Sequence, residues 1–175
     1  MDPEYTIPFS PRRGEGRRRG NTANTMPGTY SQLLLHVVFS TKHREPWIST
    51  EMAQRLFPYM GGLVRMEKGI LFDIGGVADH VHMYLRWRPD KSVSDLMRTV
   101  KARSSKWIHD TYPAHGAFAW QEGYSVFTVS KSQEASVKAY IANQAEHHKK
   151  TDFKTELLQL FRAHGVEFDE RFVFD

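Results

Sequence analysis

The sequence predicts an α+β domain in which a mostly antiparallel β-sheet packs against helices, and three observations lead to this prediction. Short β-branched and apolar runs, which are typical of strands, recur along the chain after residue 30. Longer segments with apolar residues at helical spacing lie between some of these runs. Two of the runs, 69–76 and 79–87, are joined by so short a link that they indicate an antiparallel hairpin.

The first half of this region predicts a strand, a helix and then the hairpin. Residues 33–41, "LLLHVVFST", are short, apolar and β-branched, as expected of a buried strand. A helix is expected from Ser49, which can cap it, and Pro58 should bend or end that helix. The hairpin strands are "GILFDIGG" (69–76) and "DHVHMYLRW" (79–87).

The second half predicts a helix, a strand and two further helices, over 92–109, 119–130, 130–150 and 153–163. Ser92 can cap the first of these helices, and Ser130 with Gln133 forms an S-x-x-Q capping box. The resulting β-α-β-β-α-β order is that of the ferredoxin-like fold, which RRM domains share. Helices are expected to cover one face of the sheet, with one more helix near the C-terminus.

Composition narrows the classes of function. The chain has 175 residues, a length typical of one domain, and it has no cysteine, which excludes disulfides, thiolate metal sites and a cysteine nucleophile. Its net charge of +4 suits a polyanionic partner. The apolar run at 33–39 is too short to cross a membrane. We therefore expect no membrane partner, and we expect a cytoplasmic location.

The first 28 residues differ from the rest in composition. The segment "SPRRGEGRRRGNTANTMPG" (10–28) is rich in glycine, arginine and asparagine and has almost no apolar residues. Residues 1–28 therefore predict a disordered tail, with the globular domain at 29–175. The arginines of this tail either contact phosphates or are simply solvated, and they are Arg12, Arg13, Arg17, Arg18 and Arg19.

Two histidines, His80 and His82, are the first candidates for chemistry. Alternation along a strand places residues i and i+2 on one face, so both imidazoles should point the same way. Such a pair can bind a divalent metal, or it can be a hydrogen-bonded pair with no ligand.

A third group is needed, and the helix at 130–150 offers one. Tyr140 and Gln144 are four residues apart and therefore share a face, beside Val137 and Ile141, which should pack on the sheet. Tyr140 can be a core aromatic and Gln144 a surface amide, but an inward-facing amide needs a partner, which a metal ion would supply.

Taken together, these residues resemble the single-tyrosine HUH transposases, which move single-stranded DNA, and their relatives associated with repetitive extragenic palindromes. The resemblance covers about 29–175, and its specific part is His-hydrophobic-His followed by Tyr-x-x-x-Gln. The matching segments are "YSQLLLHVVFSTKHREPWI" (30–48), "GGVADHVHMYL" (75–85), "SVSDLMRTVKARSSKWI" (92–108), "WQEGYSVFTVS" (120–130) and "YIANQAEHHKKTDFKTEL" (140–157).

The resemblance implies a metal-dependent DNA endonuclease and strand transferase. His80, His82 and Gln144 correspond to the ligands of Mg²⁺ or Mn²⁺, and Tyr140 corresponds to a nucleophile that forms a phosphotyrosine intermediate. The family acts as a homodimer on single-stranded DNA with hairpin ends, in the cytoplasm of bacteria or archaea. The helix with Tyr140 is then a catalytic helix.

Several alternatives stay open. His147 and His148 follow Gln144 by three and four residues, so either can approach the same metal. A domesticated or non-cutting hairpin-binding relative would share the fold. An RRM-like RNA-binding module is a further alternative, because "GYSVFTV" (123–129) loosely resembles an RNP1 strand.

Basic side chains on the helix at 92–109 are candidate nucleic-acid contacts. They either bind phosphates or form a solvated helix face, and they are Arg98, Lys101, Arg103 and Lys106.

Overall fold

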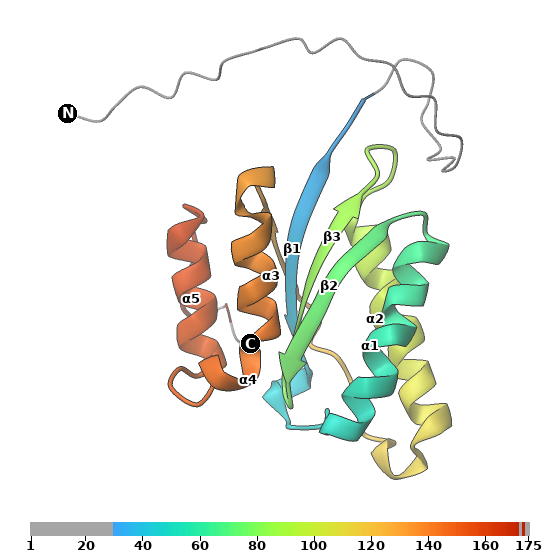
Figure 1. Cartoon of the computed structure of the whole chain (residues 1–175). Coiled ribbons are helices and arrows are strands. Elements are labelled where there is room, and N and C mark those ends of the chain that lie inside the picture. The colour runs from blue at the N-terminus through green and yellow to red at the C-terminus, as the bar shows by residue number, and fades with distance from the viewer. Residues whose placement is uncertain (1–29, 172, 174–175) are drawn as a thin grey trace, which may run out of the picture. The chain divides into compact units, whose positions relative to one another are not determined.

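The computed structural model describes residues 30–171 and 173, so the predicted tail at 1–28 lies outside the described residues. Within them, the strands form a four-stranded sheet in the order β2-β3-β1-β4, and every pairing is antiparallel (Figure 1). The strands are β1 Leu33–Ser40, β2 Ile70–Val77, β3 His80–Trp87 and β4 Ser125–Thr128. The α+β fold and the β-α-β-β-α-β order are confirmed.

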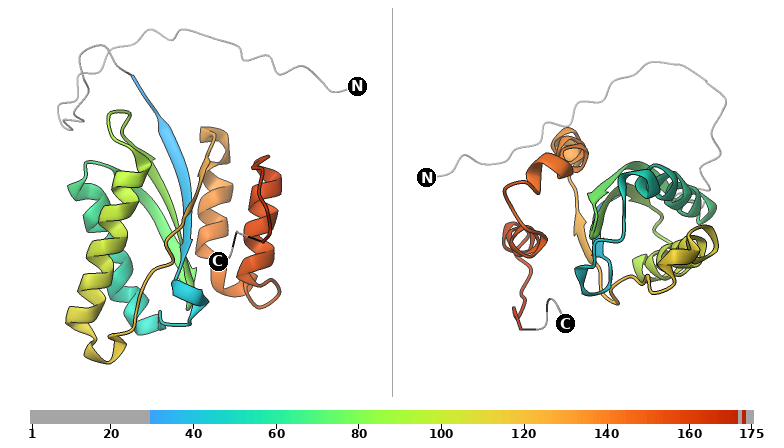
Figure 2. Two further views of the ribbon diagram at one scale, coloured as in Figure 1. Left: turned by 180° about the vertical axis from the view of Figure 1, so that it is seen from behind. Right: turned by 90° about the horizontal axis from the view of Figure 1, so that it is seen from below.

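Helices cover both faces of this sheet, whereas the sequence predicted helices on one face and one more helix near the C-terminus (Figures 1 and 2). The α-helices are α1 Thr50–Met66, α2 Val93–Thr111, α3 Glu134–Ala142, α4 Gln144–His147 and α5 Phe153–Ala163. Helices α1 and α2 lie on one face, and α3, α4 and α5 lie on the other. Short 3₁₀ turns occur at Lys42–Arg44, Pro113–His115 and Lys131–Gln133.

Strand alternation divides β3 between the two layers. Val81, Met83 and Leu85 are fully buried in the main apolar core under α1 and α2. His80 and His82 are equally buried but face the layer formed by α3, α4 and α5. The sheet therefore carries an apolar core on one side and buried polar side chains on the other.

The helix predicted over 130–150 is interrupted. Asn143, with φ −96° and ψ 15°, separates α3 from α4, so Tyr140 and Gln144 belong to different helices. The end of α3 approaches β2 at Gly75, where an added Cβ would lie 2.5 Å from the carbonyl oxygen of Ile141. Only glycine permits this approach.

The structure corrects one other local prediction and narrows a second. The strand expected over 119–130 is shorter, because only Ser125–Thr128 pair with β1 and Trp120 makes an isolated bridge to Thr41. Of the two alternatives predicted for Pro58, a bend or an end of the helix, the structure excludes the end, because α1 continues through Pro58. Pro58 has no N–H, so one backbone hydrogen bond of the helix is missing there.

Candidate metal and nucleophile site

His80 and His82 lie side by side on β3, with ring centroids 5.0 Å apart and no exposed surface. His36 of the neighbouring strand β1 stacks on His82, and its Nε2 lies 2.9 Å from His82 Nδ1. The two histidines of β3 therefore share a face, as strand alternation predicted, and His36 is a third buried imidazole beside them.

Hydrogen bonds orient both rings. The Asp79 carboxylate lies 2.7 Å from His80 Nδ1, and since a carboxylate only accepts, His80 Nδ1 carries the proton. His80 Nε2 points toward Gln144 Oε1, 3.3 Å away. The ring of His82 is likewise held by a hydrogen bond between its Nδ1 and His36 Nε2. His82 Nε2 is buried with no hydrogen-bond partner. Both Nε2 atoms face the same space.

Tyr140 and Gln144 approach this space from the helical layer. The Tyr140 ring meets His82 edge-on, with centroids 5.7 Å apart. Gln144 is buried, and its Nε2 donates to Glu156 Oε1 at 3.1 Å, which directs Gln144 Oε1 toward His80. The structure thus brings together the four side chains that the sequence singled out.

Glu156 of α5 was missed by the sequence analysis. Its carboxylate accepts a hydrogen bond from the Tyr140 hydroxyl, and its Oε2 lies 3.5 Å from Nε2 of both His80 and His82. A signal was present, since Glu156 occupies the apolar stripe of α5 between Phe153 and Leu157. A carboxylate in such a stripe is costly unless it has a partner.

Burial determines the charge of these groups. It lowers the pKa of His36 to about 3 and that of His82 to about 4, so both imidazoles are neutral near neutral pH. Burial alone raises the pKa of Glu156, but His82, Tyr140 and Gln144 outweigh it and hold that pKa below its usual range. Burial, and then Glu156, raise the pKa of the Tyr140 phenol.

This donor set fits a divalent cation. Ligand atoms of His80, His82 and Glu156 all lie within 4.8 Å of one another. The pKa of the Glu156 carboxyl is held low, so an ionised carboxylate stands beside these imidazoles. Two neighbouring ligands about 2.1 Å from an octahedral ion lie about 3 Å apart, close to the 3.3 and 3.5 Å separations found here. The mixed nitrogen and oxygen donors suit a first-row divalent metal.

His147 and His148 also reach this site, but through Glu156. His148 Nε2 lies 3.1 Å from Glu156 Oε2, and His147 Nε2 lies 3.6 Å from Glu156 Oε1. The His148 and His80 rings have centroids 4.4 Å apart. Both histidines therefore lie beside the Glu156 carboxylate.

The basic residues of α2 lie on the opposite side of the sheet from Tyr140 (Figure 1). Arg98 and Lys106 are exposed and pair with Asp95 and Asp110 within the same helix. Lys101 instead turns to the 121–123 loop, where its Nζ donates to three backbone carbonyls. Arg103 is exposed, and its Nη1 lies 4.0 Å from the sulfur of Met66.

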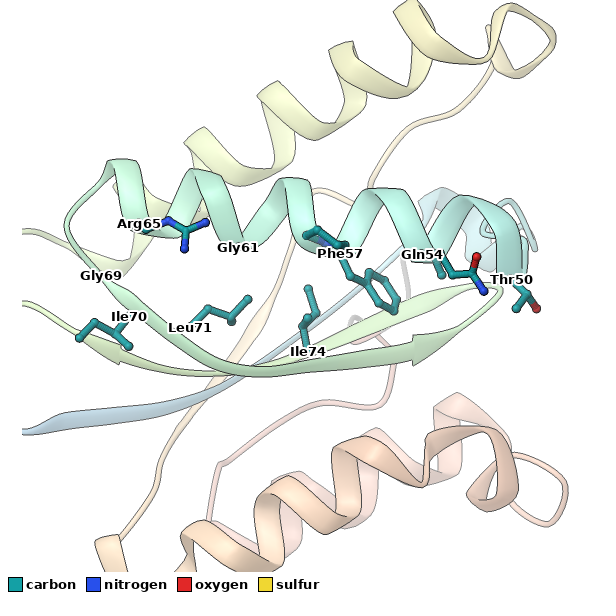
Figure 3. A pocket seen from close by; sticks show the side chains of 11 residues that line it. Thr50, Gln54, Phe57, Gly61, Arg65, Gly69, Ile70, Leu71 and Ile74 are labelled. Carbon is teal, nitrogen blue, oxygen red and sulfur yellow. The ribbon is translucent and has the colours of Figure 1, made fainter.

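A pocket of about 680 Å³ lies between α1 and β2, away from these groups (Figure 3). Phe57, Leu71 and Ile74 give it an apolar lining. None of the candidate site residues lines it, so the candidate chemistry belongs to the other face of the sheet.

Comparison with known families relates the chain to transposases. Residues 29–144 match the family model described as "Transposase IS200 like". The ISDra2 transposase TnpA of Deinococcus radiodurans is 25% identical over 122 residues, which are 67% of this chain and 87% of that protein. The transposase for insertion sequence element IS200 of Salmonella typhimurium is 29% identical over 119 residues, 65% of this chain and 78% of that protein.

Solved structures agree with this relation. A transposase structure from Deinococcus radiodurans superimposes with a TM-score of 0.57 at 26% identity, over 69% of this chain and 96% of that chain. The structure of a REP-associated tyrosine transposase bound to a REP hairpin has a TM-score of 0.55 at 13% identity, over 86% and 92% of the two chains. The second match supports the fold alone.

Proposed function

The chain belongs to the IS200-like transposase family, and we propose that it cleaves and rejoins single-stranded DNA through a covalent bond to Tyr140. The observation that carries this proposal is the position of the Tyr140 hydroxyl. This hydroxyl donates a hydrogen bond to Glu156, whose carboxylate also lies 3.5 Å from Nε2 of His80 and of His82. A nucleophile beside a convergent donor set is what phosphodiester cleavage requires.

His80, His82 and Gln144 would hold the divalent ion, Mg²⁺ or Mn²⁺, with His36 and Asp79 orienting the two imidazoles. When bound, such an ion supplies positive charge that neutralises a nonbridging phosphate oxygen and favours the phenolate form of a nearby tyrosine. The raised pKa of Tyr140 means that its phenol stays protonated without such help.

The proposed step is a transesterification at phosphorus. Tyr140 Oη forms a bond to phosphorus while the bond from phosphorus to the 3′ oxygen breaks. The phenol proton leaves, and the departing 3′ oxygen takes up a proton to become a free hydroxyl. The energy of the broken bond is kept in the phosphotyrosine, so attack by a 3′ hydroxyl can rejoin a strand without ATP.

We assign single-stranded DNA with hairpin ends as the substrate, and a homodimer in the cytoplasm as the acting form. The match to the IS200-like transposase family, and to relatives that are named transposases, supports the choice of DNA. Our candidates for contacts to the DNA phosphates are the exposed residues of α2, Arg98, Arg103 and Lys106. Lys101 instead donates hydrogen bonds to the 121–123 loop. In the described part of the chain no helix is long and apolar enough to span a membrane.

An RRM-like function is not supported. RRM domains bind RNA on an open sheet face, whereas here helices cover both faces (Figure 2). The segment 123–129 lies at β4, an edge strand of the sheet, and it provides no central aromatic platform.

The test is covalent capture of DNA. Wild-type protein is mixed with end-labelled single strands that carry hairpins from the flanks of its own gene, with Mn²⁺ or with EDTA, and run on a denaturing gel. We expect a protease-sensitive adduct in Mn²⁺ only. Tyr140→Phe should lose it while still binding the hairpin, because only the attacking oxygen is removed.

Tyr59→Phe is the matched control, since Tyr59 stacks on Trp107 on the other face of the sheet. It should retain the adduct. An adduct that persists in Tyr140→Phe would contradict the assignment of the nucleophile. Tight hairpin binding by the wild type with no adduct would identify a non-cutting relative.

A further inference from the structure

We propose that Glu156 joins the metal to the nucleophile, with Oε2 as a ligand of the divalent ion and Oε1 as the group that positions the Tyr140 hydroxyl. This inference rests on the proposed function. It adds a fourth ligand to His80, His82 and Gln144, and it makes α5 part of the active site.

The Oε2 atom has the geometry of a ligand. It lies 3.5 Å from His80 Nε2 and 3.5 Å from His82 Nε2, in the space that both Nε2 atoms face. His82 Nε2 is buried and has no hydrogen-bond partner, although a carboxylate oxygen is so close. A cation between these atoms gives each of them a partner.

The Oε1 atom has a different environment. It accepts the Tyr140 hydroxyl and also the Gln144 amide, the latter at 3.1 Å. These two bonds draw α3 and α4 to one oxygen. The other oxygen lies 3.1 Å from His148 Nε2 and 3.5 Å from Nε2 of both histidines of β3. One carboxylate is therefore shared between the group that attacks and the groups that bind the metal.

Burial and charge lead to the same conclusion. The Glu156 side chain is only 2% exposed, and its neighbours are imidazoles, a phenol and an amide. The side chains that contact it are histidines, a tyrosine and a glutamine, and no lysine or arginine of the described residues is among these contacts. A buried carboxylate is costly without an opposite charge, and a divalent ion would provide one.

Capping and apolar packing hold helix α5, and with it the Glu156 carboxylate, against the sheet. Asp152 caps it, and Phe153 and Leu157 pack in a buried cluster with Val38 of β1 and Phe127 of β4. The family model matches residues 29–144 and so ends before α5 begins. The contribution of Glu156 comes from this chain's own C-terminal region.

The first experiment measures Mn²⁺ binding to the full chain by calorimetry, with no DNA present. Glu156→Gln keeps the size of the side chain but removes its charge, and we expect it to weaken Mn²⁺ binding about tenfold or more. Glu146→Gln is the matched control, since Glu146 is exposed on α4 and pairs with Lys149. It should leave the affinity unchanged.

A second variant, His80→Ala, tests the metal site of the proposed function independently of Glu156. If His80→Ala loses Mn²⁺ and Glu156→Gln does not, Glu156 is not a ligand, while the proposed metal site survives. If neither variant changes the affinity, the metal site of the proposed function itself is wrong. Should Glu156→Gln fail to fold, Glu156→Asp keeps the charge but retracts it by one methylene, and it should weaken Mn²⁺ binding as well.

The second experiment follows Tyr140 directly. The 7 tyrosines are replaced by 3-fluorotyrosine, and the Tyr140 fluorine signal is assigned by its loss in Tyr140→Phe. In EDTA, Glu156→Gln should move this signal, because the hydroxyl then meets an amide instead of a carboxylate, and Glu146→Gln should not. An unmoved signal in folded Glu156→Gln would overturn the positioning role.

Discussion

At the scale of single residues, His36 orients His82, a ligand of the proposed metal site, without being a proposed ligand itself. Its Nε2 holds His82 Nδ1 at 2.9 Å, which leaves His82 Nε2 for the ion. Histidine ligands depend on such partners for their tautomer and orientation. His36 is 3% exposed and has a pKa of about 3 because of its burial, so it takes this role as a neutral imidazole.

We therefore expect His36→Ala to weaken Mn²⁺ binding by about 10–100-fold. His36→Gln should restore part of this loss, because its terminal amide can reach the place of Nε2. His43→Ala, at an exposed histidine of the 42–44 turn, is the control and should bind like the wild type. The Mn²⁺ affinities are measured by calorimetric titration. Equal affinities for His36→Ala and the wild type would mean that His36 contributes packing but does not orient His82.

At the scale of elements, α5 links packing to chemistry. Leu157 is 6% exposed in the cluster with Val38 and Phe127, and the preceding residue is Glu156. Leu157→Ala should lower the free energy of unfolding by about 2–4 kcal/mol through loss of buried contacts. It should also weaken Mn²⁺ binding, because α5 then positions Glu156 less firmly.

Gln159→Ala, at an exposed position of the same helix, should change neither quantity. Urea denaturation and Mn²⁺ titration of the two variants provide the comparison. A destabilised Leu157→Ala with unchanged metal affinity would show that α5 is not needed to hold the ligand.

The loop before β4 depends on another side chain, Lys101 of α2. Its ammonium donates to the carbonyls of Gln121 at 2.7 Å and Glu122 at 3.0 Å, and also to that of Gly123. Lys101→Met should lower the free energy of unfolding by about 1–2 kcal/mol, because charged donors make strong bonds to carbonyls. Lys106→Met removes an exposed pair with Asp110 and should cost less than about 0.5 kcal/mol. Equal losses in urea denaturation would argue against this role of Lys101.

At the scale of the whole molecule, the site collects side chains from β3, α3, α4 and α5. An ion bound there stabilises only the folded chain, so stability should rise with Mn²⁺ concentration. At about 100 times the dissociation constant, the gain is about 2.7 kcal/mol. Thermal unfolding should show a midpoint that rises with Mn²⁺ and falls back with EDTA, and His80→Ala should abolish the rise. A midpoint that ignores Mn²⁺ in the wild type would contradict the proposed metal site.

The sequence by itself determined the features that depend on local periodicity. Alternation along β3 places His80 and His82 on one face whatever surrounds the strand, and apolar spacing identifies α1 and α2. The order of elements then restricts the sheet to few topologies, and the antiparallel order found here is one of them.

Only the tertiary structure decided which distant side chains meet. His36 is 46 residues from His82, and Glu156 is 16 residues beyond Tyr140, so no local period relates these pairs. Gly75 admits the end of α3, the break at Asn143 separates Tyr140 from Gln144, and the packing of α5 brings in Glu156. Periodicity determines which face a side chain lies on, but the docking of elements determines what it faces, because docking depends on contacts made across the whole chain.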